Sequence, residues 1–79
     1  MSTKEYHALK YWYEQLEKLV VGEGSAQSAG SLAKATGQSR TTAKKYLTRL
    51  VFGRSVIIVK VKHFNGQEAT LYQPIEGNL

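Results

Sequence analysis

Apolar positions at the start of the chain recur at the spacing of an amphipathic helix. The apolar stripe comprises Tyr6, Leu9, Tyr13, Leu16 and Val20, widened by Trp12 and Leu19. Ser2 and Glu5 have the S-x-x-E spacing of a capping box, which satisfies backbone donors at a helix start. The pattern therefore predicts a helix over residues 3–21, ended by Gly22 and Gly24.

Two shorter helices are predicted next, over residues 28–36 and 39–52. Ser28 and Ser39 stand where an N-cap hydroxyl accepts a hydrogen bond from the first helical turn. Gly37 occupies the position at which a left-handed residue commonly ends a helix. The two helices are thus separated by a very short turn.

The pattern changes to that of strands in the last third of the chain. Residues 55–64, SVIIVKVKHF, and 67–73, QEATLYQ, flank Asn65-Gly66, which predicts a hairpin over 55–73 with a two-residue type I′ turn. Such a turn pairs Phe64 with Gln67, Lys62 with Ala69, Val61 with Thr70 and Val59 with Tyr72. The face expected to pack on the helices is Ile57, Val59, Val61 and Tyr72, and the other face is Ile58, Lys60, Lys62 and Leu71.

These elements predict one α+β domain over residues 1–79, with three helices followed by a β-hairpin. The chain has no Cys, so neither disulfides nor a thiolate metal site supply stability. His7 and His63 have no ligand-like spacing around them, and we expect no metal or cofactor. No apolar run exceeds four residues, so no signal peptide or spanning segment is predicted. We expect a cytoplasmic protein, nucleoid-associated or acting in the interior of a host cell.

The charges are segregated along the chain. The net charge is +5, and from Gly24 to Gln67 there is no Asp or Glu. That block contains eight basic residues, namely Lys34, Arg40, Lys44, Lys45, Arg49, Arg54, Lys60 and Lys62. A surface that serves solubility alone intersperses the two signs. The block therefore predicts an anionic partner, nucleic acid first, and the alternative is a solvated basic surface without a partner.

The helix predicted over 39–52 places its charges on one face. If Ala43 points inward, Leu47 and Leu50 fall within about 40° of it at 100° per residue. Tyr46 then falls within about 60°. The outward side consists of Thr41, Lys44, Lys45 and Thr48, with Arg40 in the first turn. A cationic and hydroxylic face of this kind suits phosphates and base edges.

The spacing of a helix-turn-helix is present in Leu32-Ala33, Gly37, Ala43, Leu47 and Leu50. Nearly the whole chain resembles the winged helix-turn-helix superfamily, in particular small regulators of phages, plasmids and archaeal viruses. The resemblance implies a sequence-specific double-stranded DNA-binding protein that regulates transcription. The third helix would enter the major groove, and the hairpin, or wing, would touch the neighbouring backbone or minor groove. The implied DNA-binding residues are Gln38, Ser39, Arg40, Thr41, Lys44, Lys45, Thr48 and Arg49 in the helix and Lys60, Lys62, His63, Asn65 and Gln67 in the wing.

The chain departs from the commonest pattern of that superfamily in two respects. Ala43 replaces the more usual Val or Ile, and no short strand is predicted between the first two helices. Alternative functions are a winged-helix protein-interaction module and a DNA-architectural or recombination accessory factor. RNA binding fits the charge, but the aromatic residues are not arranged as a stacking platform. No nucleophile–base constellation is present, so we expect neither an enzyme nor a small-molecule ligand.

A homodimer through the first helix is a further expectation. Trp12 and Leu19 widen the apolar stripe beyond what two short helices are expected to cover, and a two-fold pairing buries such a surplus. It also sets two recognition helices on one side of the DNA. The alternative is that the wing and the residues after Pro74 cover Trp12 and Leu19 within one chain.

Overall fold

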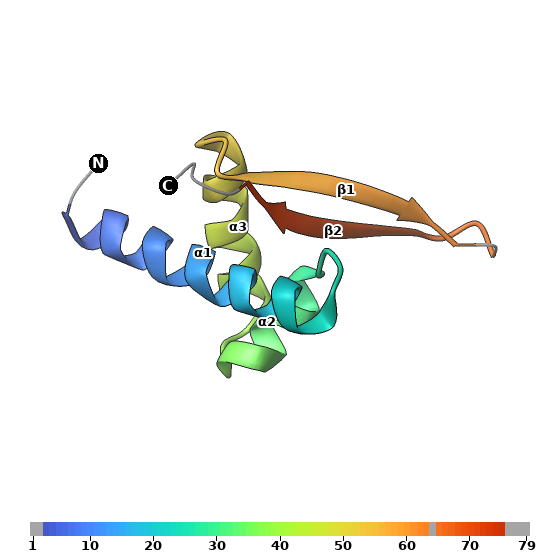
Figure 1. Ribbon diagram of the computed structural model, residues 1–79, viewed down its shortest axis with the longest axis horizontal. Helices are drawn as coiled ribbons and strands as arrows, with labels where there is room; N and C mark the ends of the chain where they lie inside the picture. Colours follow the sequence, from blue (N-terminus) through green and yellow to red (C-terminus); the bar gives the residue numbers. More distant parts are fainter. Residues whose placement is uncertain (1–2, 64, 76–79) are drawn as a thin grey trace.

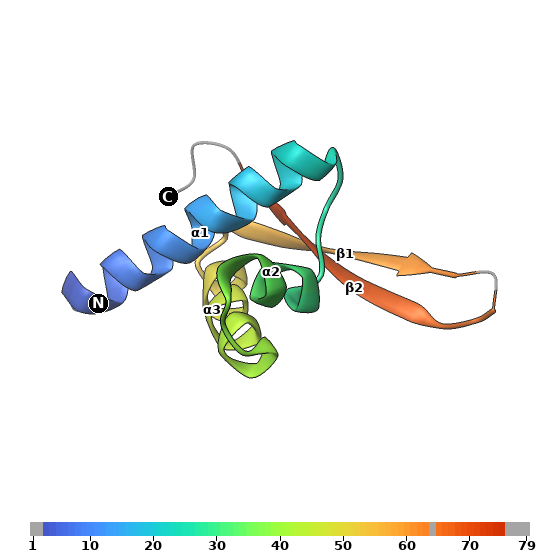
Figure 2. The same cartoon turned by 90° about the horizontal axis from the view of Figure 1, so that it is seen from below.

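The computed structural model describes residues 3–63 and 65–75, so the predicted cap Ser2 lies outside the described residues. The elements are α1 (Thr3–Glu23), α2 (Ala29–Thr36), α3 (Arg40–Phe52), β1 (Val56–Lys62) and β2 (Glu68–Pro74). Three helices followed by an antiparallel hairpin form an α+β arrangement consistent with a winged-helix topology. The hairpin projects from the helices and contributes to overall extents of 43 × 25 × 22 Å (Figures 1 and 2).

The core lies where the three helices meet the first residues of β1 and the last part of β2. The largest side chains with almost no exposure are Leu16, Leu32, Leu47, Leu50 and Val56. Five positions of the predicted apolar stripe of α1, as widened by Trp12 and Leu19, are buried, namely Leu9, Trp12, Tyr13, Leu16 and Val20. Tyr6 was expected on the same face but is 43% exposed, because the first turns of α1 extend past the other helices (Figure 2).

The helix ends agree closely with the predicted caps. The Oγ atoms of Ser28 and Ser39 each accept a hydrogen bond from the backbone N–H three residues later, and Gly37 is left-handed with φ +71°. α1 was expected to end at residue 21, yet it continues through Gly22 to Glu23. The residue that ends it is Gly24, which has φ +75° and whose N–H donates to the Val20 carbonyl at 2.8 Å.

Trp12 is covered within the chain by α3. Its ring stacks on that of Tyr46 with centroids 5.4 Å apart and an interplanar angle of 12°, and only 5% of Trp12 is exposed. Leu19 is half-buried and packs against the same core. We expected Trp12 to be covered by a second copy of the chain or by the wing together with the residues after Pro74. Among the described residues, it is the Tyr46 ring of α3 that stacks on it.

The register of the hairpin differs from the predicted one by one residue. The observed pairs include Ile58 with Tyr72, Val59 with Leu71, Val61 with Ala69 and Lys62 with Glu68. The predicted pairs of Lys62 with Ala69, Val61 with Thr70 and Val59 with Tyr72 are therefore wrong. The predicted pair of Phe64 with Gln67 involves a residue outside the described ranges.

The conformation around the turn explains this shift. The N–H of His63 donates to the Gln67 carbonyl at 2.8 Å, so three residues rather than two separate the last pair. Gly66 has φ +85°, and the Asn65 Oδ1 accepts from the N–H of Gln67 at 3.1 Å. A left-handed glycine closing a three-residue loop is a common hairpin connection. Asn-Gly is therefore in the turn as predicted, but the turn is one residue longer.

The shift turns β2 over relative to β1, because successive side chains of a strand face opposite sides. Tyr72 is buried on the face it shares with Val56 and Ile58, and it is not on the face of Val59. Ile57 and Val61, which were expected to pack on the helices, are 47% and 39% exposed. The reason is that the hairpin leaves the helices soon after Val56 (Figure 1), so the core reaches only the first part of β1.

A single residue between the first two helices forms a β-bridge with the outer edge of β2. The N–H of Gln27 donates to the Tyr72 carbonyl at 3.1 Å, and the N–H of Tyr72 donates to the Gln27 carbonyl at 2.7 Å. Gln27 lies between α1 and α2, where no strand was predicted. One paired residue leaves no repeating pattern in the sequence, so this bridge could not be predicted. It connects the base of the hairpin to the start of α2.

Candidate nucleic-acid interface

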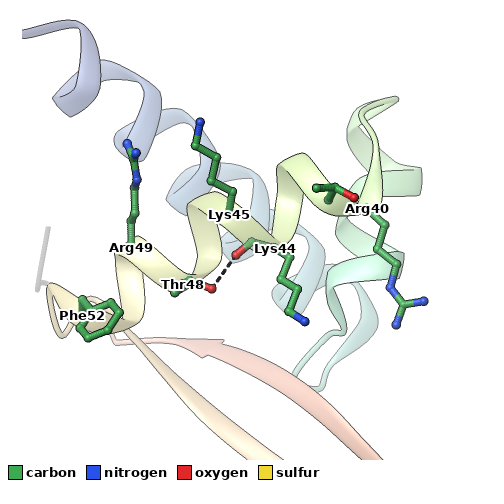
Figure 3. A pocket seen from close by; sticks show the side chains of 7 residues that line it. Arg40, Lys44, Lys45, Thr48, Arg49 and Phe52 are labelled. Atoms are coloured by element: carbon green, nitrogen blue, oxygen red, sulfur yellow. Dashed lines mark hydrogen bonds between the residues drawn. The ribbon is translucent and has the colours of Figure 1, made fainter.

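The outward side of α3 carries a continuous row of exposed side chains. Ala43, Leu47 and Leu50 are buried as predicted, and the opposite side of the helix lines an open concavity (Figure 3). We call this surface the α3 face, and its residues are Arg40, Thr41, Lys44, Lys45, Thr48, Arg49 and Phe52. No described residue that lines the concavity is acidic.

The turn before α3 fixes where this face begins. The Ser39 Oγ accepts from the N–H of Thr42 at 3.1 Å and donates to the Thr42 Oγ1 at 2.8 Å. The N–H of Gln38 donates to the Ala33 carbonyl at 3.0 Å, across the left-handed Gly37. Gln38 and Ser39 are both exposed beside Arg40. The Ser39 hydroxyl already has two partners, so its first role is to hold the start of α3.

The cations of α3 point in two directions from the centre of the face (Figure 3). Lys45 and Arg49 extend toward one flank, whereas Lys44 and Arg40 extend toward the hairpin. The hydroxyl of Thr48, between these flanks, donates to the Lys44 carbonyl at 2.8 Å. Thr48 therefore offers a partner its remaining oxygen lone pairs and its methyl group.

The two wing lysines lie on the polar face of the hairpin. Lys60 pairs with Thr70 and Lys62 with Glu68, and paired residues share one face of an antiparallel ladder. Thr70 and Glu68 line a crevice together with Arg40 and Lys44 of α3. This face of the wing therefore borders the amino-terminal half of α3 through Thr70 and Glu68, and both wing lysines are exposed on it.

The remaining predicted wing residues, His63, Asn65 and Gln67, are exposed near the end of the hairpin. The Asn65 side chain holds the turn through its hydrogen bond to Gln67. These residues lie away from the helices (Figure 1), so the structure separates them from the α3 face while keeping them on the same hairpin as Lys60 and Lys62.

Two acidic residues from outside the acid-free segment approach the basic surface. The guanidinium of Arg49 lies 2.9 Å from the Glu5 carboxylate of α1, and 6.0 Å from the ring centroid of Tyr46. Glu68 lines the crevice beside Arg40 and Lys44. Neither contact was predicted from the sequence, because Glu5 and Glu68 lie outside the acid-free segment from 24 to 67.

Phe52 belongs to the α3 face but was absent from the residues predicted to bind. Its side chain is 84% exposed at the last position of α3. The helical wheel contains the signal for it, because Phe52 follows Ala43 by nine residues and therefore lies about 180° from the buried side at 100° per residue. Phe52 served in the prediction from sequence only as the end of the helix and was assigned to neither face.

Comparisons with known proteins identify no relative, so any functional assignment depends on the site alone. No family model matches the chain, and neither the curated proteins nor the solved structures searched contain a match. Within residues 3–63 and 65–75, no three His, Cys, Asp or Glu side chains are grouped so as to hold a metal ion. In the same ranges, no helix combines the length and the apolar character needed to cross a bilayer.

Proposed function

We propose that this protein is a member of the winged helix-turn-helix superfamily that binds double-stranded DNA with sequence specificity and regulates transcription. In this proposal α3 enters the major groove and the hairpin rests on the adjacent backbone or minor groove. The proposed protein binds DNA and catalyses no reaction. We propose that it acts in the cell interior, in contact with the chromosome or with the DNA of an infecting element. The protein is proposed to need no cofactor.

One observation carries the proposal. The four cations of the α3 face lie on one side of a single helix, and the two wing lysines share a hairpin face with Thr70 and Glu68, which line a crevice with Arg40 and Lys44. Phosphate contacts by Lys and Arg supply most of the affinity for a duplex, whereas side chains on a helix in the groove read base edges. The exposed position of Arg40 at the start of α3 suits a bidentate contact with guanine, since the first turns of a recognition helix meet the bases.

A protein-interaction module is the second candidate, and it also rests on one observation. Ile57 and Val61 are exposed on the hairpin face opposite the lysines, with Val59 and Leu71 half-buried between them. An exposed apolar patch is a common feature of protein-binding surfaces. A DNA-architectural or recombination accessory factor would use the same basic surface as a regulator, with less dependence on sequence.

We further propose that the active unit is a homodimer formed through α1. Tyr6 and Tyr11 are 43% and 44% exposed on this helix, and pairing of two copies doubles the length of DNA that is read. The burial of Trp12 against Tyr46 removes one reason for expecting a dimer. Tyr6 and Tyr11 lie about 140° apart around the helix at 100° per residue, so they do not share one face, and the proposal now depends on Tyr11.

Binding of a labelled duplex at several salt concentrations tests the proposed function. If about five to eight phosphates are neutralised, log K falls against log salt with a slope of roughly −4 to −7. The double variant Lys44→Gln, Lys45→Gln should bind much more weakly. Lys10→Gln, Lys18→Gln loses the same charge from exposed positions of α1 and should bind nearly as wild type. Equal loss in both, or no binding at low salt, contradicts the proposal.

A further inference from the structure

Phe52 is the most exposed of the large apolar residues on the described surface. It has 84% of its surface exposed, whereas Trp12, Tyr13 and Tyr72 are buried in the core. Exposing a phenylalanine to water forgoes about 1.5–3 kcal/mol of burial free energy. A single exposed apolar residue is ordinary on a protein surface, so the position of Phe52 must carry the argument.

Phe52 points in the central direction of the α3 face around the helix axis, although it is the last residue along α3. At 100° per residue it lies about 180° from Ala43, and Thr41, Lys45 and Thr48 lie within about 40° of the same direction. The ring stands at one end of the concavity that the cations line (Figure 3). None of the other described residues that line this concavity is a large apolar one. The surroundings therefore suit an anionic partner with one apolar contact, and they do not form an apolar patch for a protein.

DNA offers an apolar group to a helix in its major groove. The 5-methyl group of thymine is the apolar feature among the base edges there, and Phe is among the side chains that contact it. Arg40 and Phe52 are twelve positions apart, which is about 18 Å along a helix at 1.5 Å per residue. At 3.4 Å per base pair, this span is about five base pairs if the helix follows the groove.

We infer that Phe52 is a specificity-determining residue, which contacts the 5-methyl group of a thymine about five base pairs or fewer from the base read by Arg40. The inference rests on the proposed DNA binding and deepens it. It implies that the protein prefers thymine at one flank of its site, and that this preference comes from an apolar contact rather than from a hydrogen bond. Phe52 would thus add to the discrimination provided by the polar residues of the α3 face.

Uracil substitution tests this contact, because uracil lacks only the 5-methyl group of thymine and keeps the same hydrogen-bonding groups. The tightest duplex is first selected from a random pool, and each of its thymines is then replaced by uracil. We expect wild type to lose affinity about fourfold at one thymine, the factor for one buried methyl group. Phe52→Ala should bind the thymine and uracil duplexes equally at that position.

Val21→Ala is the matched control, since Val21 is another exposed apolar residue at the end of a helix. It should retain the full difference between thymine and uracil. Circular dichroism checks the fold of each variant, and Phe52→Gln replaces Phe52→Ala if the latter unfolds.

The outcomes separate this inference from the proposed function. If wild type binds duplex DNA but no thymine shows methyl dependence, or if Phe52→Ala keeps it, the inference is wrong and the DNA binding stands. If Phe52→Ala loses affinity on every duplex while keeping the difference between thymine and uracil, Phe52 contacts the backbone, which also overturns it. Absence of duplex binding by wild type at low salt overturns both.

Discussion

The guanidinium of Arg49 on α3 lies 2.9 Å from the carboxylate of Glu5 on α1, although 44 residues separate the two in the chain. Both side chains are partly exposed, and exposed ion pairs of this kind contribute only about 0–1 kcal/mol to stability. The pair therefore matters less for folding than for the charge that Arg49 presents on the α3 face. Glu5 competes with any phosphate for the same guanidinium.

Removing this carboxylate should strengthen binding to DNA. In Glu5→Gln, Arg49 is freed to meet a phosphate, so the affinity should rise up to about fivefold, in line with the 0.2–1 kcal/mol range of exposed pairs. The slope of log K against log salt should steepen by about 0.9. Fluorescence anisotropy over a salt series measures both. Glu14→Gln removes the same charge from an exposed position of α1 nine residues later, and an equal gain in that control would reduce the effect to net charge.

α3 and the hairpin should contribute to the proposed DNA binding in different ways. Arg40→Ala or Lys44→Ala should weaken binding to the cognate site by roughly 1–3 kcal/mol and relax the base preference there, if either residue makes a bidentate base contact. Lys60→Ala and Lys62→Ala should weaken binding to all sequences about equally, because phosphates carry no sequence information. Selection of sites from a random pool with each variant distinguishes the two effects, with Lys18→Ala as the control. The roles are reversed if the wing variants change the preferred sequence and the helix variants do not.

The proposed dimer predicts a change of mass with one substitution on α1. Wild type should sediment as a dimer at micromolar concentration, and Tyr11→Glu should sediment as a monomer because a charge is placed in the contact. Trp12 is unsuitable for this test since it is buried against Tyr46. Val61→Glu, on the exposed apolar face of the hairpin, should leave the mass unchanged. A monomeric mass for wild type, together with DNA sites lacking two-fold symmetry, would rule out the dimer.

The ring stack between Trp12 and Tyr46 should be worth a measurable coupling energy. Trp12→Ala is expected to cost about 3–5 kcal/mol, which is a large part of the 5–15 kcal/mol that stabilises a typical domain. Leucine variants at the two positions and the double variant form a gentler cycle. Urea unfolding of these proteins should give a coupling of about 0.5–1.5 kcal/mol. Additive effects of the two leucine variants would mean that the rings contribute burial alone.

Two glycines should respond to alanine with opposite signs. Gly37→Ala should destabilise the fold by about 1 kcal/mol, because Gly37 has φ +71° and a side chain in this conformation is strained. Gly22→Ala should stabilise it by up to about 0.5 kcal/mol, since Gly22 lies in the last turn of α1 and an added Cβ meets nothing within 4 Å apart from its chain neighbours and the nearby backbone of the helix. Thermal unfolding measures both, and a loss of stability in Gly22→Ala would show that the end of α1 is constrained in another way.

The sequence by itself determined the features that depend on neighbours along the chain. Ser28 and Ser39 cap the helices they were expected to cap, and Gly37 ends α2 in the left-handed conformation. The two sides of α3 also follow from helical geometry alone, with Ala43 buried and Lys44 exposed. A cap or a helical face involves residues within a turn or two of each other, so the order of residue types is enough to predict it.

Only the tertiary structure decided how these elements meet. The loop around Gly66 is one residue longer than its Asn-Gly signal indicated, and the resulting shift turned Tyr72 onto the face of Val56. The approach of Glu5 to Arg49 and the stack of Trp12 on Tyr46 join residues that are distant in the chain. Such contacts depend on the packing of whole helices against one another, which minimises exposed apolar surface over the entire core, and no local pattern of residues encodes the outcome of that packing.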